Sequence, residues 1–487
     1  MSPRALGPIL VSLAVLPVSA QQAGVASSVR FTPGVVAEKV VSLLDGRQQY
    51  AVYLPSAYRE DRRWPVLLLM DPRGRALVPM RLVQAAAERH GYLVLSSYNT
   101  LSDGPNQPNI DAMAAMLTDV QRLFAVDPAR FYLVGFSGTA RFAWEVGYGM
   151  RGHVAGVIGF GAGPPPGFDF SPPGAGSVPF GFFGGSGTRD FNYEEMLGLD
   201  EALERRAAPH RLQYFDGLHS WPPARVMTDA VDWMQLQAMR QGLVPLDSSW
   251  VDSLMLADLA RAGELEAGGE IYAAYRRYRA ITLDFEGLQD VSWPSARARE
   301  LERGRAVRHA ADQLRGIVDR NHEYLRNLTQ FLQQFRHAGT PPRLDRSLKI
   351  LRVAELKRQQ ADTGDTVASL AAARLLAHLV AFSSSYEPRD YLDQGDPLRA
   401  LGMLAIAEAV RPRMSGVCYY RARALSMLGR NEEAVQAVEC WARAVRPDAD
   451  SVAANPELAA LRDDPQFRAL LTRLREEQRP PGAPQSP

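Results

Sequence analysis

An alternation of short apolar runs with helical patterns occupies residues 49 to 239 and constrains the fold more than any other feature of the chain. Seven runs rich in β-branched and aromatic residues are typical of strands, at 49–53, 65–70, 93–97, 131–135, 156–160, 179–183 and 211–215. Helical patterns follow or separate them at 78–90, 110–124, 139–148, 193–206 and 223–240. The run from Val66 to Met70 is apolar throughout, as in a strand covered on both faces. The pattern predicts an α/β domain with a doubly wound, mostly parallel sheet.

After Gly242 the strand signals stop and long amphipathic helices rich in Ala, Leu, Arg and Glu follow. An internal repeat is visible there, because Ala400 and Ala434 occupy equivalent places in two helices and 434 minus 400 gives the 34-residue period of tetratricopeptide repeats. The helix pair expected over 416–445 resembles such a repeat, whereas the copy before it is degenerate. We therefore expect an all-α, tetratricopeptide-like domain that forms a small array.

The first twenty residues have the composition of a secretory signal peptide. Arg4 precedes an apolar stretch over 5–17, and Val18-Ser19-Ala20 is a small-residue cleavage site. The alternative is a membrane anchor, but the stretch is shorter than the roughly 20 residues that a spanning helix needs. No later apolar run is expected to span a membrane either. These features predict a periplasmic or secreted protein with no membrane span after cleavage.

The expected organisation is a signal peptide over 1–20, a catalytic domain over 21–242, the helical domain over 243–478 and a disordered tail over 479–487. The chain has 55 Lys and Arg against 54 Asp and Glu, and this balance gives no reason to expect a nucleic-acid partner. Its only cysteines, Cys418 and Cys440, are too few for a disulfide framework or a thiolate metal cluster. They either pair or remain buried thiols.

A candidate nucleophile follows the fourth predicted strand. The sequence Gly135-Phe136-Ser137-Gly138-Thr139 lies between that strand and a helical pattern, which is the context of a nucleophile elbow. Such a sharp turn needs small residues two positions on either side of the serine. Gly135 meets this requirement, whereas Thr139 stands where a third glycine is usual. The alternative is an ordinary turn in which the serine caps the helix.

Candidates for the acid and the histidine come later in the chain, each just after a predicted strand. Asp190 ends the Gly-rich loop that follows residues 179–183, and His219 follows residues 211–215. This order, serine then acid then histidine, is the one found around nucleophile elbows. Asp169 is a rival acid, but it lies in a Pro-rich connection. We therefore expect Ser137, Asp190 and His219 to form a catalytic triad.

The triad residue types suit acyl transfer. A serine hydroxyl becomes a strong nucleophile when an imidazole takes its proton, and a carboxylate orients that imidazole. The charge that develops on the carbonyl oxygen also needs donors, usually the amide after the nucleophile and one from the loop after the third strand. We expect Gly138 to supply the first and Arg73 the second, with Gly74 in reserve, because Pro72 has no N–H.

Several motifs in this order resemble the esterase and dienelactone-hydrolase-like branches of the α/β-hydrolase superfamily. They are Leu54-Pro55, Asp71-Pro72-Arg73-Gly74, Gly135-Phe136-Ser137-Gly138, the Gly187-to-Asp190 loop and the His219-to-Pro223 ending. The resemblance covers about residues 40–240. It implies an α/β-hydrolase fold and hydrolysis of carboxylic esters through an acyl-enzyme, with no metal and no organic cofactor.

Aromatic residues in the loops after the strands are candidates for substrate contact, with Trp221, Tyr98 and Phe191 as the leading ones and Phe168, Phe170 and Tyr193 beside them. The alternative for each is packing of a loop onto the sheet.

The sequence thus predicts a serine hydrolase for small-molecule esters. Alternatives are a peptidase or acyltransferase on the same fold, or an inactive binding protein whose repeats recruit a partner. The helical domain itself is expected either to bind a protein or peptide partner or to support the catalytic domain.

Overall fold

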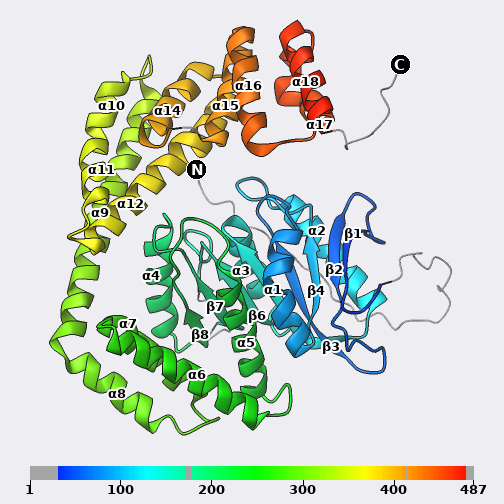
Figure 1. Ribbon diagram of the computed structural model, residues 1–487, viewed down its shortest axis with the longest axis vertical. Helices are drawn as coiled ribbons and strands as arrows, with labels where there is room; N and C mark the ends of the chain where they lie inside the picture. Colours follow the sequence, from blue (N-terminus) through cyan, green and yellow to red (C-terminus); the bar gives the residue numbers. More distant parts are fainter. Residues whose placement is uncertain (1–30, 171–177, 413, 479–487) are drawn as a thin grey trace. The chain divides into compact units, whose positions relative to one another are not determined.

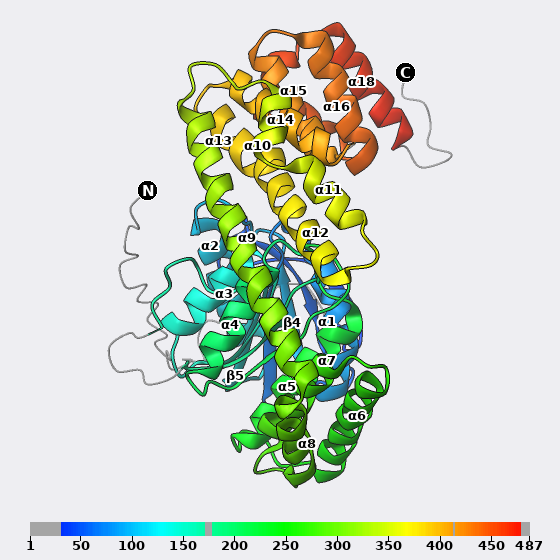
Figure 2. The same cartoon turned by 90° about the vertical axis from the view of Figure 1, so that its left-hand side faces the viewer.

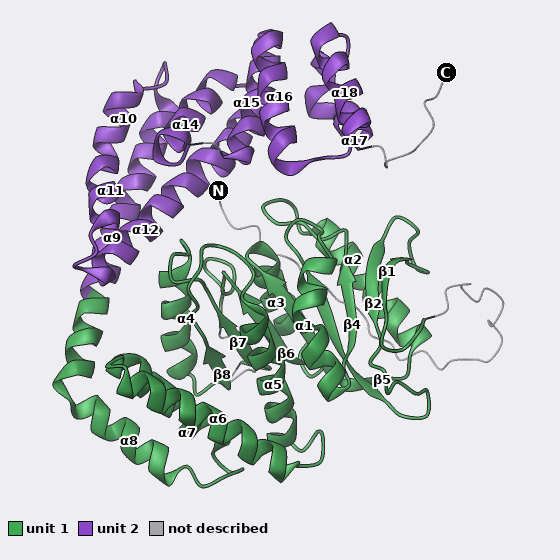
Figure 3. Ribbon diagram, in the orientation of Figure 1, with its two compact units in different colours: residues 1–315 green, residues 316–487 purple. Residues whose placement is uncertain are grey.

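A computed structural model describes residues 31–170, 178–412 and 414–478. The predicted signal peptide and tail lie outside these residues. The chain forms two compact units, Met1–Arg315 and Gly316–Pro487 (Figure 3). Their boundary falls inside α9 (Arg305–His337), a long helix that can be followed in Figure 2. The sequence instead placed the domain boundary at 242/243.

The first unit contains an eight-stranded sheet with the order β1-β2-β4-β3-β5-β6-β7-β8. β1 and β2 pair antiparallel, as do β2 and β4, and all other neighbours are parallel. The strands are β1 (Val36–Val41), β2 (Gln49–Tyr53), β3 (Trp64–Met70), β4 (Leu93–Ser97), β5 (Val126–Phe136), β6 (Val154–Phe160), β7 (Gly181–Gly185) and β8 (His210–Leu212). β1 was not predicted, because Val40 is its only buried residue and an edge strand so exposed has no clear apolar pattern.

Helices cover both faces of the sheet, as Figure 1 shows. Val66 and Leu68 of β3 share one apolar core with α2 (Gln107–Leu123), α3 (Gly138–Gly149) and α4 (Tyr193–Glu204). Leu67 and Leu69 share the other core with α1 (Leu77–His90) and α5 (Ala224–Arg240). Adjacent residues of one strand thus enter opposite cores, because side chains alternate across a sheet. The predicted α/β sheet with helices on both faces is confirmed.

Buried charges attach α6 (Ser248–Ala267) and α7 (Ile271–Phe285) to the last strand of the sheet. The Arg211 guanidinium on β8 lies 2.8 Å from an Asp258 oxygen on α6 and 2.9 Å from an Asp284 oxygen on α7. Trp233 Nε1 donates to the other Asp284 oxygen at 2.7 Å. A buried charge is costly unless it is paired, so these contacts hold both helices on the sheet. This explains why the first unit extends past residue 242, through α8 (Ser292–Arg303).

Replacing Arg211 by Met should lower the free energy of unfolding of the first unit by about 3–5 kcal/mol, because Asp284 is left buried without its cation. Urea unfolding followed by tryptophan fluorescence measures this, since all seven tryptophans except Trp441 lie in that unit. Arg59→Ala is the control, because Arg59 and Asp61 form an exposed ion pair, and it should change the free energy by less than about 1 kcal/mol. Equal effects of the two variants would contradict a structural role for the buried pair.

A buried histidine makes the same region sensitive to pH. His210 Nε2 lies 3.3 Å from an Asp200 oxygen on α4, and its Nδ1 contacts the Ala208 carbonyl at 2.7 Å. Burial by itself would lower the pKa of His210, but the Asp200 carboxylate and that carbonyl hold it above the ordinary value of 6.5. The protonated pair therefore adds stability in full below pH 6.5, and this contribution is lost as pH rises through the pKa of the folded state.

Thermal unfolding of the wild type and of His210→Gln at pH 6 and pH 9 tests this coupling. The midpoint of the wild type should fall more than that of the variant between the two pH values, since the variant has no imidazolium to lose. Parallel shifts in the two proteins would show that His210 makes no contribution that depends on its charge.

The second unit is all-helical over its described residues, 316–412 and 414–478. It contains the later part of α9, then α10 (Leu344–Ile350), α11 (Val353–Ala361), α12 (Thr366–Ala381), a π-helical turn at Phe382–Tyr386, α13 (Glu387–Asp393), α14 (Pro397–Val410), α15 (Ser415–Met427), α16 (Asn431–Val445), α17 (Ala449–Ala454), a 3-10 turn at Pro456–Leu461 and α18 (Pro465–Glu477). α15 and α16 occupy the interval predicted for a repeat, and a Cys418–Cys440 disulfide joins them. The pairing that the sequence left open is therefore present, while assignment to the tetratricopeptide family stays a prediction.

One helical segment of the second unit, Thr366–Asp393, is long and apolar enough to cross a membrane by length and composition. In length and composition alone, this segment differs from the expectation that no later apolar run is long enough to span a membrane. Half of its most apolar window is buried within the unit, and Leu376 and Leu379 contribute to the unit's main core. The apolar side chains of α12 thus pack against neighbouring helices.

Candidate active site

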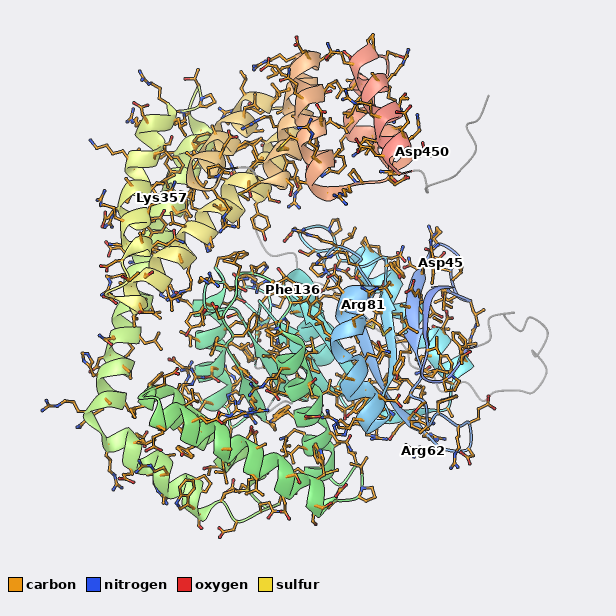
Figure 4. The ribbon with its side chains drawn as sticks, in the orientation of Figure 1. Asp45, Arg62, Arg81, Phe136, Lys357 and Asp450 are labelled. Carbon is orange, nitrogen blue, oxygen red and sulfur yellow. A yellow bond between two sulfur atoms is a disulfide. The ribbon has the colours of Figure 1, made fainter. Side chains whose placement is uncertain are left out.

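Ser137 occupies a sharp turn between β5 and α3, directly after Phe136, which Figure 4 labels. Its backbone angles are φ 55° and ψ −126°, a conformation that costs free energy for any residue with a side chain. A Cβ atom on Gly135 would lie only 2.5 Å from the Thr139 carbonyl oxygen, so this position must be glycine. Ser137 N–H donates to the Phe160 carbonyl at 2.8 Å, which ties the turn to β6. The local geometry is that of a nucleophile elbow.

Thr139, the departure from the usual glycine, fits this turn through its hydroxyl. Thr139 Oγ1 accepts from the Phe136 N–H at 3.0 Å and lies 2.7 Å from the Met70 carbonyl oxygen, to which it donates. The side chain is fully buried, so no water is needed to satisfy these groups. Thr139 thus links the elbow to the end of β3, and this departure from the usual glycine supports the turn.

Replacing Thr139 by Val keeps the shape of the side chain but removes its hydroxyl. The variant should lose about 1–3 kcal/mol in the free energy of unfolding, because the buried Phe136 N–H loses its partner. Thr139→Ser is the matched control, since it retains the hydroxyl and should stay close to wild type. Urea unfolding measures both, and a Ser variant as unstable as the Val variant would show that the methyl group, not the hydroxyl, matters.

The three predicted triad residues form one chain of hydrogen-bond contacts. His219 Nε2 lies 2.9 Å from Ser137 Oγ, and His219 Nδ1 lies 2.9 Å and 3.0 Å from the two Asp190 carboxylate oxygens. Asp190 is 1% exposed, whereas the His219 side chain is 21% exposed. The carboxylate is thus enclosed while the imidazole faces the open side of the site. Of the two carboxylates considered for the acid, Asp190 is the one whose contact with His219 the structure shows.

The loops that carry the acid and the histidine continue the pairing of β7 and β8. Thr188 N–H donates to the Phe215 carbonyl at 2.8 Å, and Arg189 N–H donates to the Gly217 carbonyl at 2.9 Å. Asn192 N–H then donates to an oxygen of the acid at 2.8 Å. These backbone contacts set the separation of the carboxylate and the imidazole, so the triad geometry depends on the register of the two loops.

Of the backbone amides predicted to donate to a substrate carbonyl oxygen, only that of Gly138 is free to do so. The Gly138 N–H opens α3 and has no partner among the described residues. The Arg73 N–H, in contrast, donates to Asp71 Oδ1 at 2.9 Å, and the Gly74 N–H donates to the Asp71 carbonyl at 3.1 Å. The choice of Arg73, with Gly74 in reserve, is therefore contradicted, because both amides are already bonded to Asp71.

Asp71 is a residue of the site that the sequence analysis did not single out. Its buried side chain accepts hydrogen bonds from the backbone and guanidinium of Arg75 and, at 2.8 Å, from Trp221 Nε1. Burial raises the pKa of Asp71, but the hydrogen bonds from Arg75, Trp221 and Arg73 outweigh it and hold the pKa below its ordinary value. The position directly after a fully buried strand was the signal that could have indicated its role.

Aromatic rings surround the His219 imidazole. The ring of Phe191 lies 4.2 Å and that of Phe136 lies 4.7 Å from the ring of His219. Trp221 packs against Phe136 at 5.5 Å, with its indole N–H bonded to Asp71. Phe191 and Trp221 were predicted near the substrate, whereas Phe136 was not. The rings position the imidazole and give this part of the site an apolar wall.

Other aromatic candidates face elsewhere. The Tyr98 hydroxyl donates to the Glu38 carbonyl of β1 at 2.7 Å, so its polar group serves the edge of the sheet. Phe168 and Phe170 lie 6.3 Å and 6.0 Å from the ring of Trp144 on α3. These two phenylalanines therefore pack a loop onto a helix, as the alternative interpretation had it. No group of three or more His, Cys, Asp or Glu side chains that could hold a metal occurs within residues 31–170, 178–412 and 414–478.

No family model and no curated protein matches the chain. Among solved structures it is similar to FphF, a fluorophosphonate-binding serine hydrolase of Staphylococcus aureus, with 18% identity and a TM-score of 0.35 over 42% of this chain and 98% of that one. It is also similar to the S-formylglutathione hydrolase FrmB of the same organism, with 15% identity and a TM-score of 0.33 over 41% of this chain and 97% of FrmB. A third similar structure is the Bacillus cereus carboxylesterase, with 16% identity and a TM-score of 0.31 over 39% of this chain and 95% of the esterase. TM-scores this low do not support an inference about function, which must rest on the geometry of the site.

Proposed function

We propose that the protein is a serine hydrolase of the α/β-hydrolase type that cleaves carboxylic esters through an acyl-enzyme. The observation that carries the proposal is the contact chain from Ser137 Oγ through His219 to Asp190, at a serine held in the strained conformation of an elbow. A serine that only capped a helix would need neither the strain nor the imidazole.

The contacts support an ordinary sequence of steps. Ser137 Oγ attacks the acyl carbon while His219 Nε2 accepts its proton, and Asp190 stabilises the resulting imidazolium through Nδ1–H. The Gly138 N–H donates to the carbonyl oxygen as it gains negative charge. His219 then gives the proton to the departing alcohol. Water attacks the acyl-enzyme, loses a proton to His219, and the acid leaves as Ser137 regains its hydrogen.

The proposal extends to the location of the protein. The predicted signal peptide implies export, and the Cys418–Cys440 disulfide supports it, because disulfides persist in oxidising compartments and are rare in the cytosol. A periplasmic or secreted enzyme would meet its esters outside the cytoplasm.

A panel of short-chain and aromatic chromogenic esters tests the proposed activity, with labelling by a fluorophosphonate alongside. Ser137→Ala should abolish both turnover and labelling. Asp190→Asn should lower kcat about 10⁴-fold, because the histidine loses the carboxylate that fixes its tautomer.

Asp169→Asn is the matched control for the acid and should keep wild-type turnover. Full activity of Ser137→Ala would refute the proposed nucleophile. Loss of activity in the Asp169 variant together with an active Asp190 variant would mean that the acid has been assigned to the wrong residue.

A further inference from the structure

The site lacks a second donor of the usual kind. In related acyl-transfer sites the loop after the third strand supplies a backbone N–H to the developing oxyanion. Here Pro72 has no N–H, and the amides of Arg73, Gly74 and Arg75 donate to Asp71 at 2.9 Å, 3.1 Å and 3.1 Å. The loop from 72 to 75 therefore offers the substrate no free amide. A single donor, Gly138, would leave much of the oxyanion charge unsatisfied.

A side-chain hydroxyl lies against that remaining donor. A Cβ atom built on Gly138 would lie 2.8 Å from Ser102 Oγ and 2.7 Å from Ser102 Cβ. That Cβ would be bonded to the Gly138 Cα, so the Ser102 hydroxyl lies beside the residue whose amide is the remaining donor. Ser102 is half-buried, and among the described residues its Oγ has no hydrogen-bond partner. We propose that the Ser102 hydroxyl is the second oxyanion donor, beside the Gly138 N–H.

The loop after β4 holds Ser102 in place. Ser102 N–H donates to the Pro72 carbonyl at 3.0 Å, and the buried Asn109 side chain bonds both the N–H and the carbonyl of Leu101 at 2.8 Å. Asp103, the next residue, has a φ of 62°. This left-handed conformation costs free energy for residues other than glycine. Backbone strain of this kind persists where the surroundings impose it, and it is concentrated at functional sites. The hydroxyl is thus fixed before the substrate arrives, as electrostatic stabilisation requires.

The role adds no covalent step to the proposed reaction, on which it rests. As Ser137 Oγ bonds to the acyl carbon, the carbonyl oxygen becomes an oxyanion, and Ser102 Oγ–H and Gly138 N–H both donate to it. Ser102 keeps its proton throughout and accepts no acyl group. When the tetrahedral intermediate collapses, the oxyanion becomes the carbonyl oxygen of the acyl-enzyme, and both donors remain hydrogen-bonded to it.

Ser102→Ala tests the inference, because alanine keeps the Cβ that packs against Gly138 and removes only the hydroxyl. We measure kcat and KM for an aryl ester and for the thionoester in which sulfur replaces the carbonyl oxygen. With the oxoester, kcat should fall about 10²–10³-fold while KM changes little, as expected for loss of an oxyanion donor. The preference for the oxoester over the thionoester should also shrink, because sulfur is a weak hydrogen-bond acceptor. Ser253→Ala is the control, because Ser253 is an exposed serine on α6. This variant should match wild type for both substrates.

The outcomes separate this inference from the proposed function. An active wild type with an unchanged Ser102→Ala variant overturns the role of Ser102 alone, and so does an equal fall with both esters, which indicates a packing effect. A wild type that hydrolyses neither ester and shows no labelling that depends on Ser137 overturns the proposed function and the role of Ser102 with it.

Discussion

The strained turn at Ser137 is the constraint on which the rest of the site depends. A left-handed residue between β5 and α3 brings the backbone of the strand and of the helix so close that Gly135 has no room for a side chain. The strain persists because hydrogen bonds from three strands hold it: Phe160 of β6 binds the Ser137 amide, and Thr139 joins Phe136 of β5 to the end of β3. The hydroxyl of Ser137 is thereby presented at the carboxyl edge of the sheet, where the later loops converge.

The sheet and the contacts among Ser137, Asp190 and His219 could be predicted because both leave local signals in the sequence. Each of the seven predicted intervals overlaps a strand, and the fully buried strands β3, β4 and β7 were the clearest signals, whereas β8 covers only two residues of 211–215. Ser137, Asp190 and His219 each follow a predicted strand, so their common edge could be inferred from connectivity alone. β1 was missed because it has a single buried residue, Val40, and no alternation of buried and exposed positions, and an edge strand needs only one ladder of hydrogen bonds.

Other features depend on contacts between distant residues, which the sequence does not display. The oxyanion donor was assigned to Arg73 by counting from the strand, but whether an amide is free depends on what its neighbours bind, and Asp71 binds it. The domain boundary at 242 followed the end of the strand signals, yet Arg211 pairs with Asp258 and Asp284 on later helices. In both cases a buried charge reorganises its surroundings, because it must be satisfied wherever its partners lie in the chain.

Asp71 also explains why a hydroxyl is better suited than an amide to complete the site. A negatively charged carboxylate in a buried site needs hydrogen-bond donors of its own. The Arg73 and Arg75 amides, the Arg75 guanidinium and the Trp221 indole are those donors, and they hold the pKa of Asp71 low enough that it stays ionised. Those groups cannot then serve the substrate. The proposed donor, Ser102, avoids this competition, because it belongs to the loop after β4 and its N–H donates to the Pro72 carbonyl and not to Asp71.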